Sequence, residues 1–159
     1  MDTASNNGHD FDLLLTRVVN VPRQLLWRGW TEAELLKRWF APLPWTTPEC
    51  TVDLRPGGLF RTVMRSPERQ DYVNDGCYLA VENNSRLVWT DTLAAGFRPS
   101  VKPFFTAVLT FEDAGSGTRY TARALHKDEA DRQTHEDMGF HTGWAQSLDQ
   151  LVTLAHELK

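Results

Sequence analysis

A histidine and a carboxylate at helical spacing are the residues of this chain best suited to acid–base chemistry. His141 stands in a stripe of apolar residues, and Asp137 precedes it by four positions. On one helix such a pair is adjacent, and a carboxylate beside an imidazole orients the ring and raises its pKa, as a general base requires. His141 and Asp137 are therefore the candidate catalytic residues. The alternative is that His141 is a neutral core residue satisfied by one hydrogen bond.

The other histidines do not complete a metal site in the sequence. His135 is followed by a glutamate, but Gly139 stands where the H-E-x-x-H pattern of zinc proteases requires its second histidine. We expect His126, which ends the last predicted strand, not to converge with His135 and His141 on one ion. The chain also has no phosphate-binding loop, dinucleotide fingerprint or nucleophile motif. We therefore expect no metal and no cofactor, so that any reaction would be simple acid–base chemistry.

Short apolar segments separated by turn residues indicate the elements that position these groups. Residues 11–19 are rich in Leu and Val and predict a first strand, and the stretches 23–30 and 32–40 predict two short helices. Turns rich in Gly, Pro and Asn then separate six further predicted strands, at 50–55, 59–65, 72–82, 86–93, 104–112 and 118–126. Strands joined by such short turns pair antiparallel.

From residue 128 the apolar period changes from that of a strand to that of a helix. Recurrence at steps of three and four predicts one long helix to residue 158, with an apolar stripe of Met138, His141, Trp144, Leu148, Leu151, Ala155 and Leu158. Gly139 and Gly143 lie four residues apart on this helix, where a glycine costs about 1 kcal/mol relative to alanine. They indicate either close contact between the helix and the sheet or room for a ligand.

Residues 21–42 contain three of the six tryptophans, in the stretch VPRQLLWRGWTEAELLKRWFAP. This stretch resembles the START-like (SRPBCC) superfamily, in the branch of the C-terminal domain of the activator of the heat-shock-protein-90 ATPase. Five shorter segments share the resemblance, which covers about residues 11–158: DLRPGG at 53–58, GCYL at 76–79, RLVWT at 86–90, GT at 117–118 and GW at 143–144.

The resemblance implies an α+β helix-grip fold. In this fold an antiparallel β-sheet wraps around a long C-terminal α-helix, and two short helices follow the first strand. It implies a single domain over residues 11–159, and we expect residues 1–10, which are polar and rich in small residues, to be flexible. The superfamily typically encloses a cavity between the sheet and the long helix.

Such a cavity implies a small hydrophobic ligand, because ligand pockets are mostly apolar with few polar groups. Strand parity and the helical stripe give nine candidate ligand-binding residues: Trp39, Phe60, Met64, Trp89, Phe105, Tyr120, Met138, His141 and Trp144. The alternative is an enzyme of cyclase, hydrolase or lyase type that uses the same cavity, with His141 and Asp137 as its acid–base pair. A chaperone-regulating interaction is a third function that the branch implies, and a homodimer is a further candidate assembly.

The composition narrows the set of partners. A net charge of −4 over 159 residues, with both signs interspersed, argues against nucleic-acid binding. No apolar run approaches the ~20 residues of a membrane span, and residues 1–10 lack the apolar core of an export signal. Cys50 and Cys77 lack metal-ligand spacing. We expect them to be buried thiols rather than a disulfide, in keeping with a cytoplasmic location.

Overall fold

The computed structural model describes residues 11–158, so the prediction of a flexible segment at 1–10 lies outside the described residues. The elements within the described part, in chain order, are β1 (Asp12–Val19), α1 (Arg23–Thr31), α2 (Ala33–Leu36), β2 (Thr46–Val52), β3 (Leu59–Arg65), β4 (Asp71–Glu82), β5 (Arg86–Thr90), β6 (Leu93–Ala94), β7 (Arg98–Pro99), β8 (Phe105–Ala114), β9 (Gly117–His126), α3 (Glu129–Asp137) and α4 (Phe140–Leu158).

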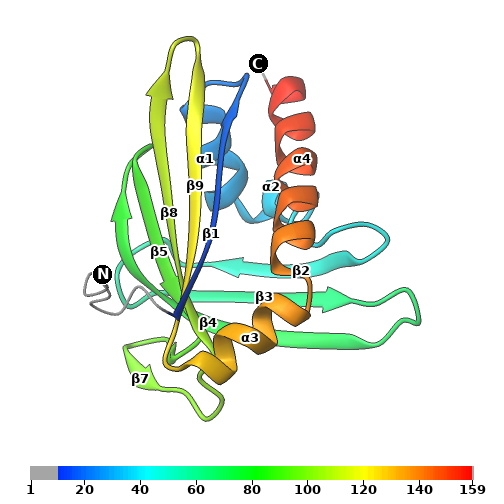
Figure 1. The fold of residues 1–159 in the computed structure, drawn as a ribbon, viewed down its shortest axis with the longest axis vertical. Coiled ribbons are helices and arrows are strands. Elements are labelled where there is room, and N and C mark those ends of the chain that lie inside the picture. Colours follow the sequence, from blue (N-terminus) through cyan, green and yellow to red (C-terminus); the bar gives the residue numbers. More distant parts are fainter. Residues whose placement is uncertain (1–10, 159) are drawn as a thin grey trace, which may run out of the picture.

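Seven of these strands form one antiparallel sheet in the order β1-β9-β8-β5-β4-β3-β2. The first strand thus pairs with the last, from Asp12 opposite Leu125 to Val19 opposite Thr118. Figure 1 shows β2, β3 and β4 running across the direction of β1, β8 and β9, with α4 standing beside β1 and α3 below it. The predicted α+β helix-grip fold is confirmed. The short strands β6 and β7 form a separate pair in the connection from β5 to β8.

The second short helix ends earlier than the sequence pattern suggests. Instead of reaching residue 40, α2 stops at Leu36, and the chain continues in turns through the following residues. The side chain of Gln150 on α4 holds the segment after α2 in a non-helical conformation. Its Nε2 donates to the carbonyl oxygens of Trp39 at 2.8 Å and Ala41 at 2.9 Å. These carbonyls are satisfied by a distant side chain rather than by a further turn of helix.

The expected long C-terminal helix is two helices, which corrects the prediction. Gly139 has a φ of +94°, a conformation that glycine adopts without steric cost, and it separates α3 from α4. Asp128 caps the start of α3, since its side chain accepts a hydrogen bond from the Asp131 amide at 2.8 Å. The residues of α4 that are buried against the sheet and α1 include Leu148, Leu151 and Ala155, so the core side of the predicted stripe is confirmed.

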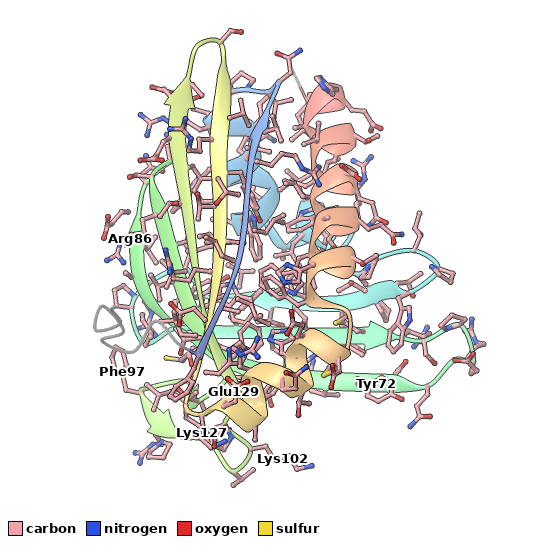
Figure 2. The ribbon with its side chains drawn as sticks, in the orientation of Figure 1. Tyr72, Arg86, Phe97, Lys102, Lys127 and Glu129 are labelled. Carbon is pink, nitrogen blue, oxygen red and sulfur yellow. The ribbon has the colours of Figure 1, made fainter. Side chains whose placement is uncertain are left out.

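Charged side chains form ion pairs on the outside of the molecule. Arg61 pairs with Glu49 at 3.1 Å and with Asp75 at 3.3 Å on the outer face of the sheet. Figure 2 shows Arg86 and Lys127 projecting away from the body of the domain. Such exposed pairs contribute little to stability, so the fold depends on the apolar layer between the sheet and the helices.

Both cysteines are free thiols, as expected. Cys77 on β4 is buried, and Cys50 on β2 is partly buried. Burial raises the pKa of the Cys50 thiol to about 11, which keeps it protonated at neutral pH. None of the helices in the described part of the chain is long and apolar enough to cross a membrane.

Candidate functional site

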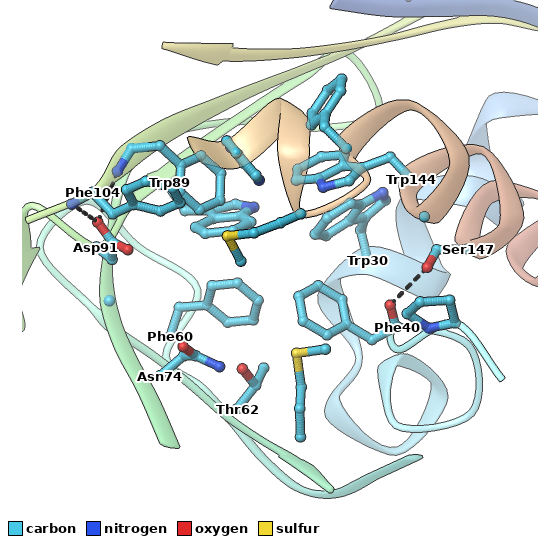
Figure 3. Close-up of a pocket in the computed structure, with 18 of the residues that line it drawn as sticks. Trp30, Phe40, Phe60, Thr62, Asn74, Trp89, Asp91, Phe104, Trp144 and Ser147 are labelled. Atoms are coloured by element: carbon cyan, nitrogen blue, oxygen red, sulfur yellow. Dashed lines mark hydrogen bonds between the residues drawn. The ribbon is translucent and has the colours of Figure 1, made fainter. Parts of the chain in front are cut away.

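A cavity of about 320 Å³ lies between the sheet and the junction of α3 with α4. Residues of β3, β4, β5, β8 and β9 line it on the sheet side, and the segment after α2 closes another side. Figure 3 shows Trp30, Phe40, Phe60, Trp89 and Trp144 arranged around the space, so the walls of the cavity are mainly aromatic.

The aromatic walls pack against one another in defined geometries. The ring centroid of Trp89 lies 5.0 Å from that of Phe60 and 5.3 Å from that of Phe105, both with the rings edge to face. Trp30 and Trp39 meet edge to face at 4.9 Å. Edge-to-face pairs add to the energy of burial and fix ring orientation. The cavity is therefore largely preformed.

Eight of the nine candidate residues line this cavity, and their part in binding a ligand stays a prediction. They are Trp39, Phe60, Met64, Trp89, Phe105, Tyr120, Met138 and Trp144. Met138 is 71% exposed, which places it at the entrance. Trp30, Phe40, Phe104 and Phe140 also line the cavity but were not among the candidates. Aromatic content was the available signal for these four.

His141, the ninth candidate, does not line the cavity. Its side chain is 53% exposed, and its Nε2 lies 3.6 Å from Oε2 of Glu136 rather than beside Asp137. Asp137 is exposed too, and its Oδ1 accepts a hydrogen bond from Nε2 of Gln133 at 2.9 Å. The structure therefore does not bring Asp137 and His141 together as a pair, and neither residue lines the cavity. The helix is interrupted at Gly139, between α3 and α4. Asp137 and His141 therefore belong to different helices, and their spacing of four residues does not place them on one helix face.

Gly143 lies where the cavity meets α4. A Cβ at this position would have no heavy atom within 4 Å outside its own helix. Of the two alternatives for the glycines, close contact with the sheet is thus ruled out at Gly143, and open space beside the helix is what the structure has. At Gly139 a glycine is required for a different reason, namely the positive φ of +94° that separates α3 from α4.

A few polar groups interrupt the aromatic lining. The hydroxyl of Tyr120 accepts a hydrogen bond from Nε1 of Trp30 at 3.0 Å, and both side chains are buried. Oδ1 of Asp91 accepts from the amides of Phe104 at 2.7 Å and Phe105 at 3.0 Å (Figure 3). Burial raises the pKa of the Asp91 carboxyl, against the opposing effect of these two amides.

Two buried histidines, His126 and His135, meet beside the cavity, a contact that the sequence pattern did not indicate. Nε2 of His126, at the end of β9, lies 2.8 Å from Nδ1 of His135 on α3. Nδ1 of His126 lies 2.7 Å from the carbonyl oxygen of Phe11. Burial, with a smaller contribution from His126, lowers the pKa of His135 to about 4. His135 lines the cavity and His126 does not.

The sequence pattern indicated the inward position of His126 but not that of His135. His126 shares strand parity with Tyr120, Ala122 and Ala124, which all face inward. His135 had no such signal, because the rest of α3 is polar. In the described part of the chain no group of three or more His, Cys, Asp or Glu residues is placed to hold a metal ion.

Comparisons with known proteins agree with this fold. The family model described as activator of Hsp90 ATPase homolog 1-like protein matches residues 20–156. The crystal structure of protein NE0264 from Nitrosomonas europaea is similar to the chain, with 49% identity, a TM-score of 0.90, and coverage of 92% of this chain and 94% of that one.

More distant structures share the fold alone. Protein Ms6760 from Mycobacterium smegmatis has 24% identity and a TM-score of 0.78, with coverage of 93% of this chain and 92% of that one. A Rhodobacter sphaeroides protein has 20% identity and a TM-score of 0.80, with coverage of 93% and 94%. No curated protein is significantly similar to the chain. Because the family model spans most of the described residues, the chain belongs to the family of activator of Hsp90 ATPase homolog 1-like proteins, a branch of the START-like superfamily.

Proposed function

We propose that this domain binds a small, largely apolar molecule in the cavity between the sheet and the α3–α4 junction. The observation that carries the proposal is the aromatic cavity of about 320 Å³, which opens beside Gly143 with no side chain to fill it. Its volume lies at the lower end of the roughly 300–1,000 Å³ of ligand pockets, and its mainly apolar lining with few polar groups is typical of them.

Binding is favoured over acid–base catalysis by the titratable groups of the cavity. A general base acts best when its pKa lies near the working pH. The pKa of His135 is about 4, so its ring is a weak base at neutral pH. Asp91 has one carboxylate oxygen engaged by two backbone amides. His141 and Asp137, the earlier candidates for catalysis, lie outside the cavity.

Filling the cavity from α4 tests the proposal. We expect the neutral fluorescent probe N-phenyl-1-naphthylamine to bind the parent protein saturably at one site. Gly143→Leu should abolish this binding while leaving the melting temperature unchanged or raised, because leucine has the higher helix propensity and open space beside it. Thr142→Leu is the matched control, since it adds the same side chain at an exposed position one residue away.

Two outcomes would overturn the proposal. One is equal binding of the probe by the parent, Gly143→Leu and Thr142→Leu, which would place the site elsewhere. The other is a parent protein that binds no apolar probe. That result would leave an interaction with a chaperone of the Hsp90 type, or with a second copy of the chain, as the function to pursue.

A further inference from the structure

We propose that the ligand of this cavity carries a neutral hydroxyl group, of a phenol or an alcohol, which donates a hydrogen bond to Nε2 of His135. This inference rests on the proposed function and adds to it the chemical class of the ligand. It is carried by the geometry of the His126–His135 pair, whose hydrogen bonds fix where each proton lies.

The positions of the protons follow from the backbone carbonyl at one end of the pair. The oxygen of Phe11 is an acceptor only, so Nδ1 of His126, 2.7 Å away, carries a hydrogen and donates it. In a neutral imidazole the other nitrogen is then an acceptor. Nε2 of His126 therefore accepts from Nδ1–H of His135 at 2.8 Å. By the same rule Nε2 of His135 carries a lone pair and no hydrogen.

That lone pair is available to the cavity. His135 is 7% exposed, and its ring lies among aromatic residues that line the cavity, with centroid distances of 4.7 Å to Phe105, 5.3 Å to Phe140 and 6.3 Å to Trp144. Its Nδ1 is turned to His126, which is not part of the lining. The Nε2 edge is thus the one that a ligand meets. No residue of the described part of the chain donates to it.

An unpaired acceptor in an apolar wall favours ligands that can donate a hydrogen bond to it. A ligand that covers Nε2 without donating to it leaves a buried acceptor unpaired, which costs more than the hydrogen bond itself contributes. Anionic ligands are disfavoured, because the lone pair repels them and Asp91 also lines the cavity. A neutral hydroxyl on an apolar body satisfies both conditions.

A matched pair of probes tests this selection. We expect 2-naphthol to bind about tenfold more tightly than 2-methoxynaphthalene, which has a similar body but no hydrogen to donate. Both affinities are measured by NMR titration of the tryptophan indole N–H signals. In His135→Asn the amide nitrogen occupies the position of Nδ1 and still donates to His126, whereas the Nε2 acceptor is gone. This variant should bind both probes equally. His141→Asn, at an exposed histidine, is the control and should keep the tenfold preference.

The outcomes separate this inference from the proposed function. Equal affinities of the parent for the two probes, or a preference that survives in His135→Asn, would overturn the hydroxyl assignment and leave the apolar site intact. Binding of neither probe would overturn the proposed function and this inference with it. If His135→Asn does not fold, the ¹⁵N chemical shift of His135 Nε2 in the parent decides. A bound hydrogen on Nε2 at neutral pH, or no change of its shift with 2-naphthol, would contradict the inference.

Discussion

Nε2 of His126 lies 2.8 Å from Nδ1 of His135, so a hydrogen bond joins the two buried rings. A proton taken up by His135 goes to its Nε2, the nitrogen that carries no hydrogen in the neutral ring. The hydrogen bonds from His135 to His126 and from His126 to Phe11 are then both kept. Proton uptake by His135 thus changes the cavity-facing atom from an acceptor to a donor.

The pair makes the stability of the domain sensitive to mild acid. The pKa of His135 is lowered from 6.5 to about 4 in the folded protein. The unfolded chain therefore binds a proton between these pH values while the folded protein does not. Stability is full above pH 6.5 and falls as the pH approaches 4, by about 3 kcal/mol from this group. Urea unfolding at pH 7, 6, 5 and 4.5 measures how steeply the free energy of unfolding changes with pH.

The comparison with His135→Asn isolates the contribution of His135. Burial raises the pKa of Asp91, so Asp91 gives a slope of the opposite sign, and His126 of β9 also acts on His135. The parent should lose more stability than His135→Asn between pH 6.5 and 4.5. Identical losses in the two proteins would show that His135 is not a neutral buried group.

Tyr120→Phe removes the acceptor of a buried indole. Nε1 of Trp30 donates to the Tyr120 hydroxyl at 3.0 Å, and both residues are 2% exposed. Leaving this donor unpaired should lower the free energy of unfolding by about 1–3 kcal/mol. Tyr72→Phe, at a tyrosine that is 46% exposed, is the control and should change stability by less than about 0.5 kcal/mol. Equal small effects would mean that the Trp30–Tyr120 hydrogen bond contributes nothing.

Leu148→Asp tests the core side of α4. Leu148 is 1% exposed and belongs to the main apolar core. A carboxylate placed there has no partner, so the variant should be destabilised by more than about 4 kcal/mol. Thr142→Asp introduces the same charge at an exposed position of the first turn of α4, where the helix dipole favours it. Circular dichroism melting of the three proteins distinguishes them, and a Leu148→Asp variant that melts like the parent would contradict the burial of this face.

His141→Gln should alter neither probe binding nor stability appreciably. The side chain is 53% exposed, and its contact with Glu136 at 3.6 Å is a surface pair worth less than about 1 kcal/mol. The parent and the variant are compared by binding of N-phenyl-1-naphthylamine and by assays with esters, lactones and epoxides. Turnover by the parent that disappears in His141→Gln would restore His141 as a catalytic residue.

Much of the fold was predictable because its signals are local. Strand periodicity and turn residues predicted the seven sheet strands in their order along the chain, and the stretch at 21–42 predicted the two short helices. The end of α2 was not predictable, because its following segment is held by Gln150, more than a hundred residues later. The division of the C-terminal helix at Gly139 was missed because the apolar stripe continues through it.

Site residues were predictable where strand parity determines which way a side chain points. They were not predictable where their position depends on how distant elements pack together. Phe60 and Met64 lie on one face of β3, so both reach the cavity. The prediction that Asp137 and His141 are adjacent depended on one continuous helix, and the helix is divided between them. The meeting of His126 and His135 depends on how α3 folds back beside β9, which no local pattern encodes.

Occupation of the cavity is most directly measured through the six tryptophans. Four of them line it: Trp30, Trp39, Trp89 and Trp144. Trp27 and Trp45 do not and serve as internal controls. Titration with N-phenyl-1-naphthylamine should shift the four indole N–H signals saturably and leave those of Trp27 and Trp45 in place. Saturable shifts at Trp27 or Trp45 alone, or no saturable shift at any of the six, would contradict a ligand-binding cavity between the sheet and the helices.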